Sequence, residues 1–288
     1  AITSGAGNVA IGFDALSTED AHGKNIAIGY KALETLNVGA DGYNVGIGYE
    51  AGNDLTTGIQ NVAIGAHALD TANASNENIA IGYNALTGEV KGHRNVAVGD
   101  STLAAQQFGT STNSYNTAIG YLAGNDVTTG IYNTLVGALA GDTITDADFN
   151  VAIGTSALTA NTVGSKSVAV GHGSLANQNP ATAADMFNVA VGNDAGNAIT
   201  TGSSNTLVGG QAGDALTEGL YNIAIGTDAL TADTKGSRSI AIGRRTLYAQ
   251  NFTTATDAYN TAIGFEAGND ITTGTGNTLL GALAGDAL

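Results

Sequence analysis

A short motif recurs along the whole chain at a nearly fixed spacing, and this periodicity limits the fold more than any other feature. The motif reads Asn-Val-Ala-Ile-Gly at Asn8 and occurs in sixteen copies, whose spacing is mostly 17, with one spacing of 19 and three of 21. Similar stretches open at Asn44, Asn116, Asn188 and Asn260 and thus recur with a period of 72. Four motif units therefore form a larger repeat, and we expect residues 1–288 to be one repetitive segment.

Each repeat unit predicts one coil of a solenoid. In the unit that opens at Asn150, Val151 and Ile153 alternate with Ala152, and this period of two is typical of a short β-strand. Gly occupies the fifth position of all sixteen units, where a turn with positive φ is expected. A second apolar pair, Ala157-Leu158, predicts a second short strand, and a polar turn follows it. We expect an all-β parallel solenoid of about 16 coils, with 17–21 residues in each.

The sequence predicts which side chains fill the core of each coil and what the Asn that opens most coils does. Val9, Ile11 and Leu16 are examples of the three aliphatic side chains that we expect each coil to bury. Stacked Asn side chains can form a hydrogen-bonded ladder between coils, as in cross-β assemblies, and Ser167 and Ser239 interrupt it. The predicted ladder comprises Asn8, Asn25, Asn44, Asn61, Asn78, Asn95, Asn116, Asn133, Asn150, Asn188, Asn205, Asn222, Asn260 and Asn277.

The third position of each coil suggests an interface. It is Ala in twelve coils, Gly at Gly46, and Leu at Leu135, Leu207 and Leu279, which again recur with the period of 72. A solvated strand face would carry polar residues, so we expect these three leucines to make contacts between chains around a symmetry axis. The alternative is that this face forms a second layer of a wider core within one chain.

Composition excludes several other functions. The formal net charge is −16, which disfavours binding to a nucleic-acid backbone, and no apolar run approaches the roughly 20 residues of a membrane-spanning helix. There is no Cys, so a disulfide framework is excluded. No Ser, His and acid arrangement and no phosphate-binding loop is evident, and we expect neither an enzyme nor a catalytic residue nor a bound cofactor.

The histidines and the Asn-Asp pairs are the candidate metal ligands. His22, His67, His93 and His172 lie singly in their coils without the spacing of a histidine pair, so we expect solvated loop residues. The pairs Asn53-Asp54, Asn125-Asp126 and Asn269-Asp270 recur at one coil position and raise the possibility of calcium. The calcium-binding nonapeptide is missing, however, and a turn in which Asn or Asp bonds the local backbone is favoured. No metal site is therefore predicted.

The three longest coils carry extra segments, residues 104–115, 176–187 and 248–259, and each contains aromatic residues. Phe108, Phe187 and Phe252 are candidates for stacking on sugars, because binding sites often lie on loops that a rigid scaffold holds. The favoured alternative is that these segments fold back over the solenoid or bridge neighbouring chains. Aromatic residues just before the opening Asn, such as Tyr43 and Tyr132, are expected to be packing positions.

The repeat resembles two known families. Asn-Thr-Ala-Ile-Gly-Tyr-Leu-Ala-Gly at Asn116 and Asn-Ile-Ala-Ile-Gly-Tyr-Asn-Ala-Leu at Asn78 resemble repeats of bacteriophage tail fibres. Ser-Val-Ala-Val-Gly at Ser167 and Ser-Ile-Ala-Ile-Gly at Ser239 are similar to the left-handed β-roll heads of trimeric autotransporter adhesins, whose coils are shorter. This resemblance covers the whole chain.

The resemblance implies a left-handed solenoid, three parallel copies of the chain around one axis, and an extracellular location. The first candidate function that it implies is the shaft of a phage tail fibre, part of a longer fibre that reaches toward a host surface. The alternative is a bacterial surface adhesin or filament that binds host matrix or glycans. The expected partners are therefore two further copies of the chain and a host surface glycan or protein.

Overall fold

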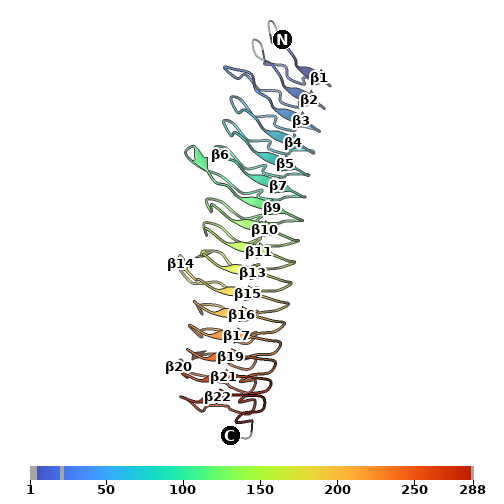
Figure 1. Ribbon diagram of the computed structural model, residues 1–288. Coiled ribbons are helices and arrows are strands. Elements are labelled where there is room, and N and C mark those ends of the chain that lie inside the picture. Colours follow the sequence, from blue (N-terminus) through green and yellow to red (C-terminus); the bar gives the residue numbers. More distant parts are fainter. Residues whose placement is uncertain (1–4, 20–22, 287–288) are drawn as a thin grey trace. The chain divides into compact units, whose positions relative to one another are not determined.

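The computed structural model describes residues 5–19 and 23–286, and the regular secondary structure of this part of the chain is β-strand throughout. The chain divides into two compact units, Ala1–Asp146 and Ala147–Leu288. Within each unit, strands from successive coils pair in parallel, one coil after the next (Figure 1). In its described residues, each unit is a parallel β-solenoid with eight strands in its main sheet, one from each coil, which confirms the predicted all-β solenoid. Among the described residues, no helix is long and apolar enough to cross a membrane.

The first unit has one main sheet and one small sheet. The main sheet consists of β1 (Val9–Ile11), β2 (Ile26–Ile28), β3 (Val45–Ile47), β4 (Val62–Ile64), β5 (Ile79–Ile81), β7 (Val96–Val98), β9 (Thr117–Ile119) and β10 (Thr134–Val136), in that order. The small sheet pairs β6 (Gly92–His93) with β8 (Thr112–Asn113). β8 belongs to the extra segment of the first long coil, so this segment is attached to the coil before it.

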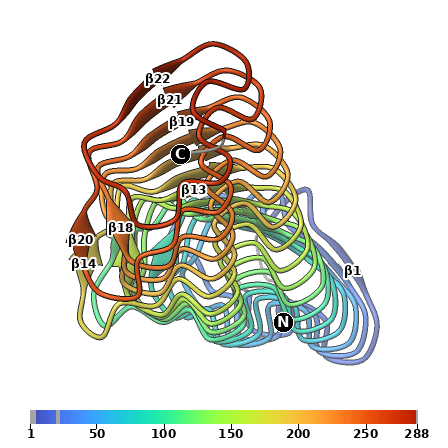
Figure 2. The same ribbon diagram turned by 90° about the horizontal axis from the view of Figure 1, so that it is seen from below.

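The second unit repeats this plan. Its main sheet consists of β11 (Val151–Ile153), β13 (Val168–Val170), β15 (Val189–Val191), β16 (Thr206–Val208), β17 (Ile223–Ile225), β19 (Ile240–Ile242), β21 (Thr261–Ile263) and β22 (Thr278–Leu280). Two small sheets pair β12 (Gly164–Ser165) with β14 (Ala184–Asp185), and β18 (Gly236–Ser237) with β20 (Thr256–Asp257). Figure 2 shows β19, β21 and β22 stacked on one wall and β18 and β20 on another.

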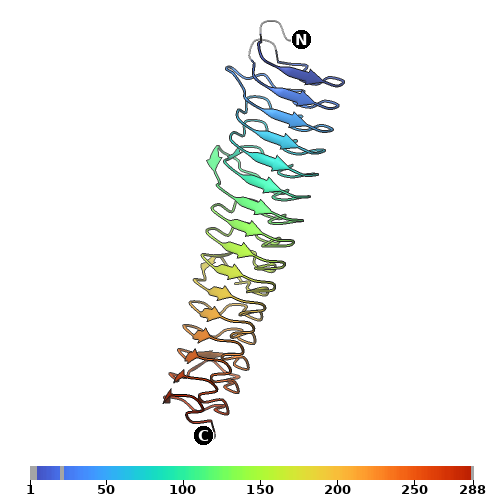
Figure 3. The same ribbon diagram turned by 45° about the vertical axis from the view of Figure 1, so that its right-hand side comes forward.

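The strands pair without any shift in register. Val62 lies opposite Ile79, Ala63 opposite Ala80, and Ile64 opposite Ile81, so equal coil positions are stacked. Figure 3 shows these short strands repeated along one wall of each unit. Because every coil adds one strand in the same register, each side chain lies next to its counterparts in the neighbouring coils.

Gly at the fifth position ends each strand, as the sequence predicts. Gly171, for example, has φ +131°, a backbone conformation that residues with a Cβ rarely adopt. A Cβ at this place would lie 2.4 Å from the carbonyl oxygen of Gly192 in the next coil. Both the positive φ and the close approach of two backbones therefore require glycine here.

The prediction of a second strand in each coil is wrong. After the corner the chain forms a turn in which Ser156 and Leu158 have φ values of 57° and 54°, which does not fit a strand. The backbone still bonds to the next coil, because Leu158 N–H donates to the Ser174 carbonyl at 3.1 Å. The turn thus satisfies its backbone groups between coils as a strand would.

The prediction of which strand face points into the core is wrong: the middle residue of each strand faces inward, and the first and third residues face outward. Ala152 is fully buried, whereas Val151 is half-buried and Ile153 is 39% exposed. The predicted core role of Leu16 is confirmed, but Val9 and Ile11 are 43% and 59% exposed, so their predicted burial is wrong. The interior is narrow, and the leucines of the turn fill it, which leaves room only for small side chains at the third position of most coils.

The rare leucines at this third position are also inside. Leu135 and Leu207 are fully buried within their own units, and Leu279 is half-buried in β22, so the prediction that the first two form contacts between chains is wrong. Glycines make room for them: a Cβ on Gly124 would lie 2.6 Å from Leu135, and a Cβ on Gly196 would lie 2.6 Å from Leu207. The alternative, that this face belongs to the core of one chain, is correct for these two residues.

Candidate functional site

The Asn side chains that open the coils lie inside each unit and link adjacent coils. Asn44 Oδ1 accepts a hydrogen bond from the backbone N–H of Asn61 at 2.9 Å and a weaker one from Asn61 Nδ2 at 3.2 Å. Asn61 Nδ2 also donates to the Ser75 carbonyl at 2.8 Å. The Asn residues that are fully or almost fully buried are Asn25, Asn44, Asn61, Asn78, Asn95, Asn116, Asn133, Asn150, Asn188, Asn205, Asn222 and Asn260, while Asn8 and Asn277 are half-buried.

A buried glutamine accompanies each Ser in this column. Gln178 Oε1 accepts from Ser167 Oγ at 3.1 Å and from Asn188 Nδ2 at 2.9 Å. Gln250 Oε1 accepts from Asn260 Nδ2 at 2.8 Å, and its Nε2 donates to Ser239 Oγ at 3.0 Å. Because the glutamine amide reaches both neighbours, the hydrogen bonding continues past the shorter serine side chain.

The main candidate surface is the outer side of each main sheet. We call the outward face of a unit the first and third residues of its three-residue strands, which are Val, Ile, Thr or Leu throughout. These side chains are half-buried or exposed; Ile153, Ile225 and Ile263 are 37–39% exposed. A sheet face that meets water normally carries polar side chains, so an apolar face of this length indicates a binding surface.

Rows of exposed aromatic residues border the outward face. One row follows the corner glycine, and in it Phe13 stacks on Tyr30, and Tyr30 on Tyr49, at centroid distances of 5.4 and 5.2 Å. The other row immediately precedes the opening Asn and comprises Tyr43, Tyr115, Tyr132, Phe149, Phe187, Tyr221 and Tyr259, which are all 42–59% exposed. Tyr115 and Tyr132 of this second row stack at a centroid distance of 5.4 Å, so these two rings pack between neighbouring coils, as predicted, although they are not buried.

Cations cover several of these rings. Arg94, Lys166 and Arg238 each lie over an aromatic ring of a neighbouring coil, within 5.4 to 5.8 Å of its centroid. Each also pairs with an acidic residue, for example Lys166 with Asp185 at 2.6 Å. The basic side chains along this border are therefore already neutralised, and they use the ring faces as packing surfaces.

Two of the three Phe side chains that were predicted to be exposed on the long coils are buried. Phe108 and Phe252 are only 6% exposed, so their predicted role as sugar-stacking residues is wrong, and the alternative of folding back over the solenoid is correct for them. Phe187 is 54% exposed, and Lys166 lies over its ring at 5.4 Å. The burial of Phe108 and Phe252 follows from the pairing of β8 and β20 with the preceding coil.

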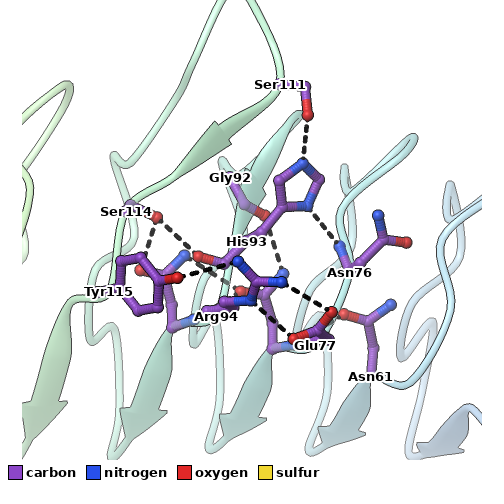
Figure 4. A network of polar contacts seen from close by, with 11 residues as sticks. Asn61, Asn76, Glu77, Gly92, His93, Arg94, Ser111, Ser114 and Tyr115 are labelled. Atoms are coloured by element: carbon purple, nitrogen blue, oxygen red, sulfur yellow. Dashed lines mark hydrogen bonds and ion pairs between the residues drawn. The ribbon is translucent and has the colours of Figure 1, made fainter.

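His93 is buried at a junction of three coils, contrary to the expectation of a solvated histidine (Figure 4). The backbone N–H of Asn76 donates to His93 Nδ1 at 2.9 Å, and His93 Nε2 lies 2.6 Å from Ser111 Oγ. Since Nδ1 accepts, the ring is neutral with its hydrogen on Nε2, which donates to Ser111. Burial, with a smaller contribution from Arg94, lowers the pKa of His93 below its usual value, whereas Glu77 opposes this shift.

Replacing His93 by Ser is expected to reduce the loss of stability on acidification. The folded chain lowers the pKa of His93, so the neutral ring stabilises the fold fully above its unfolded pKa of about 6.5, and this contribution is lost as the pH falls through the folded value. In the later repeats Ser165 and Ser237 accept the same backbone hydrogen bond, at 2.9 and 3.0 Å. Urea unfolding at about pH 7.5 and pH 5 measures the difference.

The matched control for this test is His172→Ser, because the side chain of His172 is 64% exposed. We expect His172→Ser to keep the pH dependence of the unaltered chain. Equal pH dependence in the unaltered chain and in His93→Ser would contradict the assignment of a buried neutral ring.

The first Asn-Asp pair engages neighbouring coils, whereas Asn269 Nδ2 donates to Asp270 Oδ1 at 2.7 Å within its own pair. Asn53 Nδ2 donates to the Lys31 carbonyl at 3.2 Å and to Glu34 Oε2 at 2.9 Å, and Asp54 N–H donates to the Asp70 carbonyl at 2.8 Å. The side-chain amide of Asn53 thus joins its own coil to the preceding one.

A cluster that the sequence analysis missed lies in the first unit. Nδ1 of His67 is 3.2 Å from Asp70 Oδ2 and 3.4 Å from Glu50 Oε2, and the three side chains are about a quarter to a third exposed. His67 and Glu50 occupy the same position in adjacent coils, the second residue after the corner glycine. Alignment of the coils by their glycines would have placed these two residues together. Of the other histidines, His172 is exposed as expected and His22 lies outside the described residues.

Comparison with known proteins gives no relative: no family model, no curated protein and no solved structure matches this chain.

Proposed function

We propose that this chain is a structural segment of an extracellular fibre and that it acts as a homotrimer whose copies run parallel. The resemblance of its repeat to phage tail fibres favours a tail-fibre shaft that extends toward a host cell and helps the virion to attach. By the same resemblance, the coils wind in a left-handed sense. The observation that carries the proposal is the apolar outward face of each unit, which no charged residue interrupts in a chain of net charge −16.

The outward face fits a second copy better than an unrelated partner for a geometric reason. Equal coil positions are stacked without a shift, as Val189 on Thr206 and Val191 on Val208 illustrate. The resulting rows repeat at the spacing of paired strands, about 4.8 Å. Another copy of the chain has the same spacing, so its rows can lie in the grooves between these rows along the full length of a unit. Burial of the half-exposed Val and Ile side chains then stabilises the assembly.

The adhesin alternative has less support from the surface. Binding of glycans by stacking requires free ring faces, and Tyr115, Phe187 and Tyr259 each already have a cation over the ring at 5.4 to 5.8 Å. Phe108 and Phe252 are buried. A structural role therefore explains more of the aromatic residues than a glycan-binding role does.

The mass of the folded chain in solution tests the proposal. We expect light scattering over a range of concentrations to give the mass of three chains for the unaltered protein. The double substitution Ile153→Asp and Ile225→Asp places charges on the outward face at residues that are 39% and 37% exposed, and we expect it to give the mass of one chain. Circular dichroism checks that the double variant retains its strands.

The control substitution is Thr253→Asp, which adds a charge at an exposed position of a long-coil segment, away from the outward face. We expect it to leave the mass of three chains unchanged. A single-chain mass for the unaltered protein would contradict the trimer. A mass of three chains in the double variant would show that the outward face is not the interface.

A further inference from the structure

We propose that Glu50, His67 and Asp70 form a binding site for a first-row transition-metal dication such as Zn²⁺ on the first unit. His67 Nδ1 lies 3.4 Å from Glu50 Oε2 and 3.2 Å from Asp70 Oδ2, and all three ligand atoms lie within 4.8 Å of one another. Bonds of about 2.0–2.1 Å to a tetrahedral Zn²⁺ place neighbouring ligand atoms about 3.3 Å apart. The two distances from the imidazole match this separation.

The hydrogen-bonding capacity of the imidazole supports a cation at this place. Nδ1 of a histidine carries either one hydrogen or one lone pair, so it can make one good hydrogen bond. Two carboxylate oxygens face this single atom, and they also repel each other. A metal ion accepts an electron pair from the nitrogen and from both oxygens at once, and it removes the repulsion between the carboxylates.

The scaffold holds the three side chains from rigid parts of two adjacent coils. His67 N–H donates to the Tyr49 carbonyl at 3.0 Å, and Asp54 N–H donates to the Asp70 carbonyl at 2.8 Å. The His67 ring lies edge-on between Tyr49 and Tyr83, with centroid distances of 5.3 and 6.3 Å. The backbone bonds and the two tyrosines thus restrict the imidazole to an orientation that faces the carboxylates.

The donor set selects the class of metal. One imidazole nitrogen and two carboxylate oxygens suit Zn²⁺, Co²⁺ or Mn²⁺, whereas Ca²⁺ and Mg²⁺ prefer oxygen ligands alone. Because the three side chains are 24–31% exposed, water can fill the remaining coordination positions. Bound metal would join the coil of Glu50 to the coil of His67 and Asp70 and thereby stabilise this part of the first unit.

Other repeats provide a natural comparison. At the equivalent positions of the next four-coil repeat, the residues are Leu122, Leu139 and Asp142, so the nitrogen and one carboxylate are missing. The backbone frame is the same there: Leu139 N–H donates to the Tyr121 carbonyl at 2.9 Å, and Leu139 has φ 58°, close to the 56° of His67. The double substitution Leu122→Glu and Leu139→His should therefore build a second site of the same kind.

Isothermal titration of the whole chain with ZnCl₂, in a buffer without chelating groups, tests the proposal. We expect one equivalent of Zn²⁺ per chain for the unaltered protein and for His172→Ala, which removes an exposed histidine 3.6 Å from a single carboxylate. His67→Ala should weaken binding by at least ~10-fold, the loss typical of disturbing a ligand environment. The variant with Leu122→Glu and Leu139→His should bind a second equivalent.

Titration with Co²⁺ gives an independent spectroscopic measurement. We expect visible absorption bands in the unaltered chain, and their loss in His67→Ala would show that this histidine coordinates the metal. Circular dichroism establishes that each variant keeps its fold, and CaCl₂ and MgCl₂ should produce no binding heat. The proposal is overturned if the unaltered chain binds no Zn²⁺, or if His67→Ala binds Zn²⁺ as tightly as the unaltered chain does.

Discussion

Leu207→Asp is expected to abolish cooperative folding of the coils around β16. Leu207 is fully buried, and Gly196 and Gly213 face it so closely that a Cβ on either would lie 2.6 or 2.9 Å from its methyl groups. A carboxylate at this place would be cut off from water without a partner, which costs several kcal/mol. Since each coil is stabilised by its neighbours, the damage should spread to adjacent coils.

Hydrogen exchange along the chain measures this effect, because it reports the opening of each coil separately. Leu207→Ala should be milder and lose about 2–5 kcal/mol of stability in these coils. The matched control is Thr253→Asp at an exposed position of a long-coil segment, which should leave exchange in the coils around β16 nearly unchanged. If Leu207→Asp exchanged as slowly as the unaltered protein does, the inward placement of this leucine would be wrong.

Asn61→Ala is expected to destabilise the middle coils of the first unit by roughly 2–6 kcal/mol, since two buried backbone groups lose their partners at about 1–3 kcal/mol each. These groups are the Asn78 N–H, 3.0 Å from Asn61 Oδ1, and the Ser75 carbonyl, 2.8 Å from Asn61 Nδ2. Urea unfolding followed by circular dichroism measures the change. The hydrogen bond to Asn44 at 3.2 Å is lost as well.

Asn113→Ala is the comparison, because Asn113 is exposed and lies in the two-residue strand β8. A surface substitution of this kind should change the stability by no more than about 0.5 kcal/mol. If Asn61→Ala proved as mild as Asn113→Ala, the buried Asn side chains would not be what holds successive coils together.

The coil period and the corners could be predicted from the sequence, because each depends on a local pattern. Val151-Ala152-Ile153 predicts a strand and Gly154 its end, and the structure has both. Which face of the strand points into the core could not be predicted from such a local pattern. Alternation identifies two faces, but both faces are apolar here, and the choice depends on the volume that Leu158 and its counterparts already occupy inside the coil.

The sites were less predictable than the fold for a related reason. Phe108 and Phe252 lie in segments that look like exposed loops, and their burial depends on the pairing of those segments with the preceding coil. The cluster of Glu50, His67 and Asp70 combines residues from two coils. A search for spacings within one coil finds only His67 and Asp70, whereas stacking the coils in register brings Glu50 next to them.

The left-handed backbone conformations described for the turn also restrict how this sequence can vary. Besides the corner glycine, three coil positions have positive φ: the seventh, the ninth and the last before the next opening residue, as in Ser156, Leu158 and Lys166. Residues branched at Cβ fit such a conformation poorly. Wherever the sequence contains these positions, they lack Val, Ile and Thr, which are common elsewhere in the chain. Substitutions at these positions are therefore confined to glycine and to residues that are not branched at Cβ. If coils are exchanged between related proteins, the same restriction should hold in the exchanged coils.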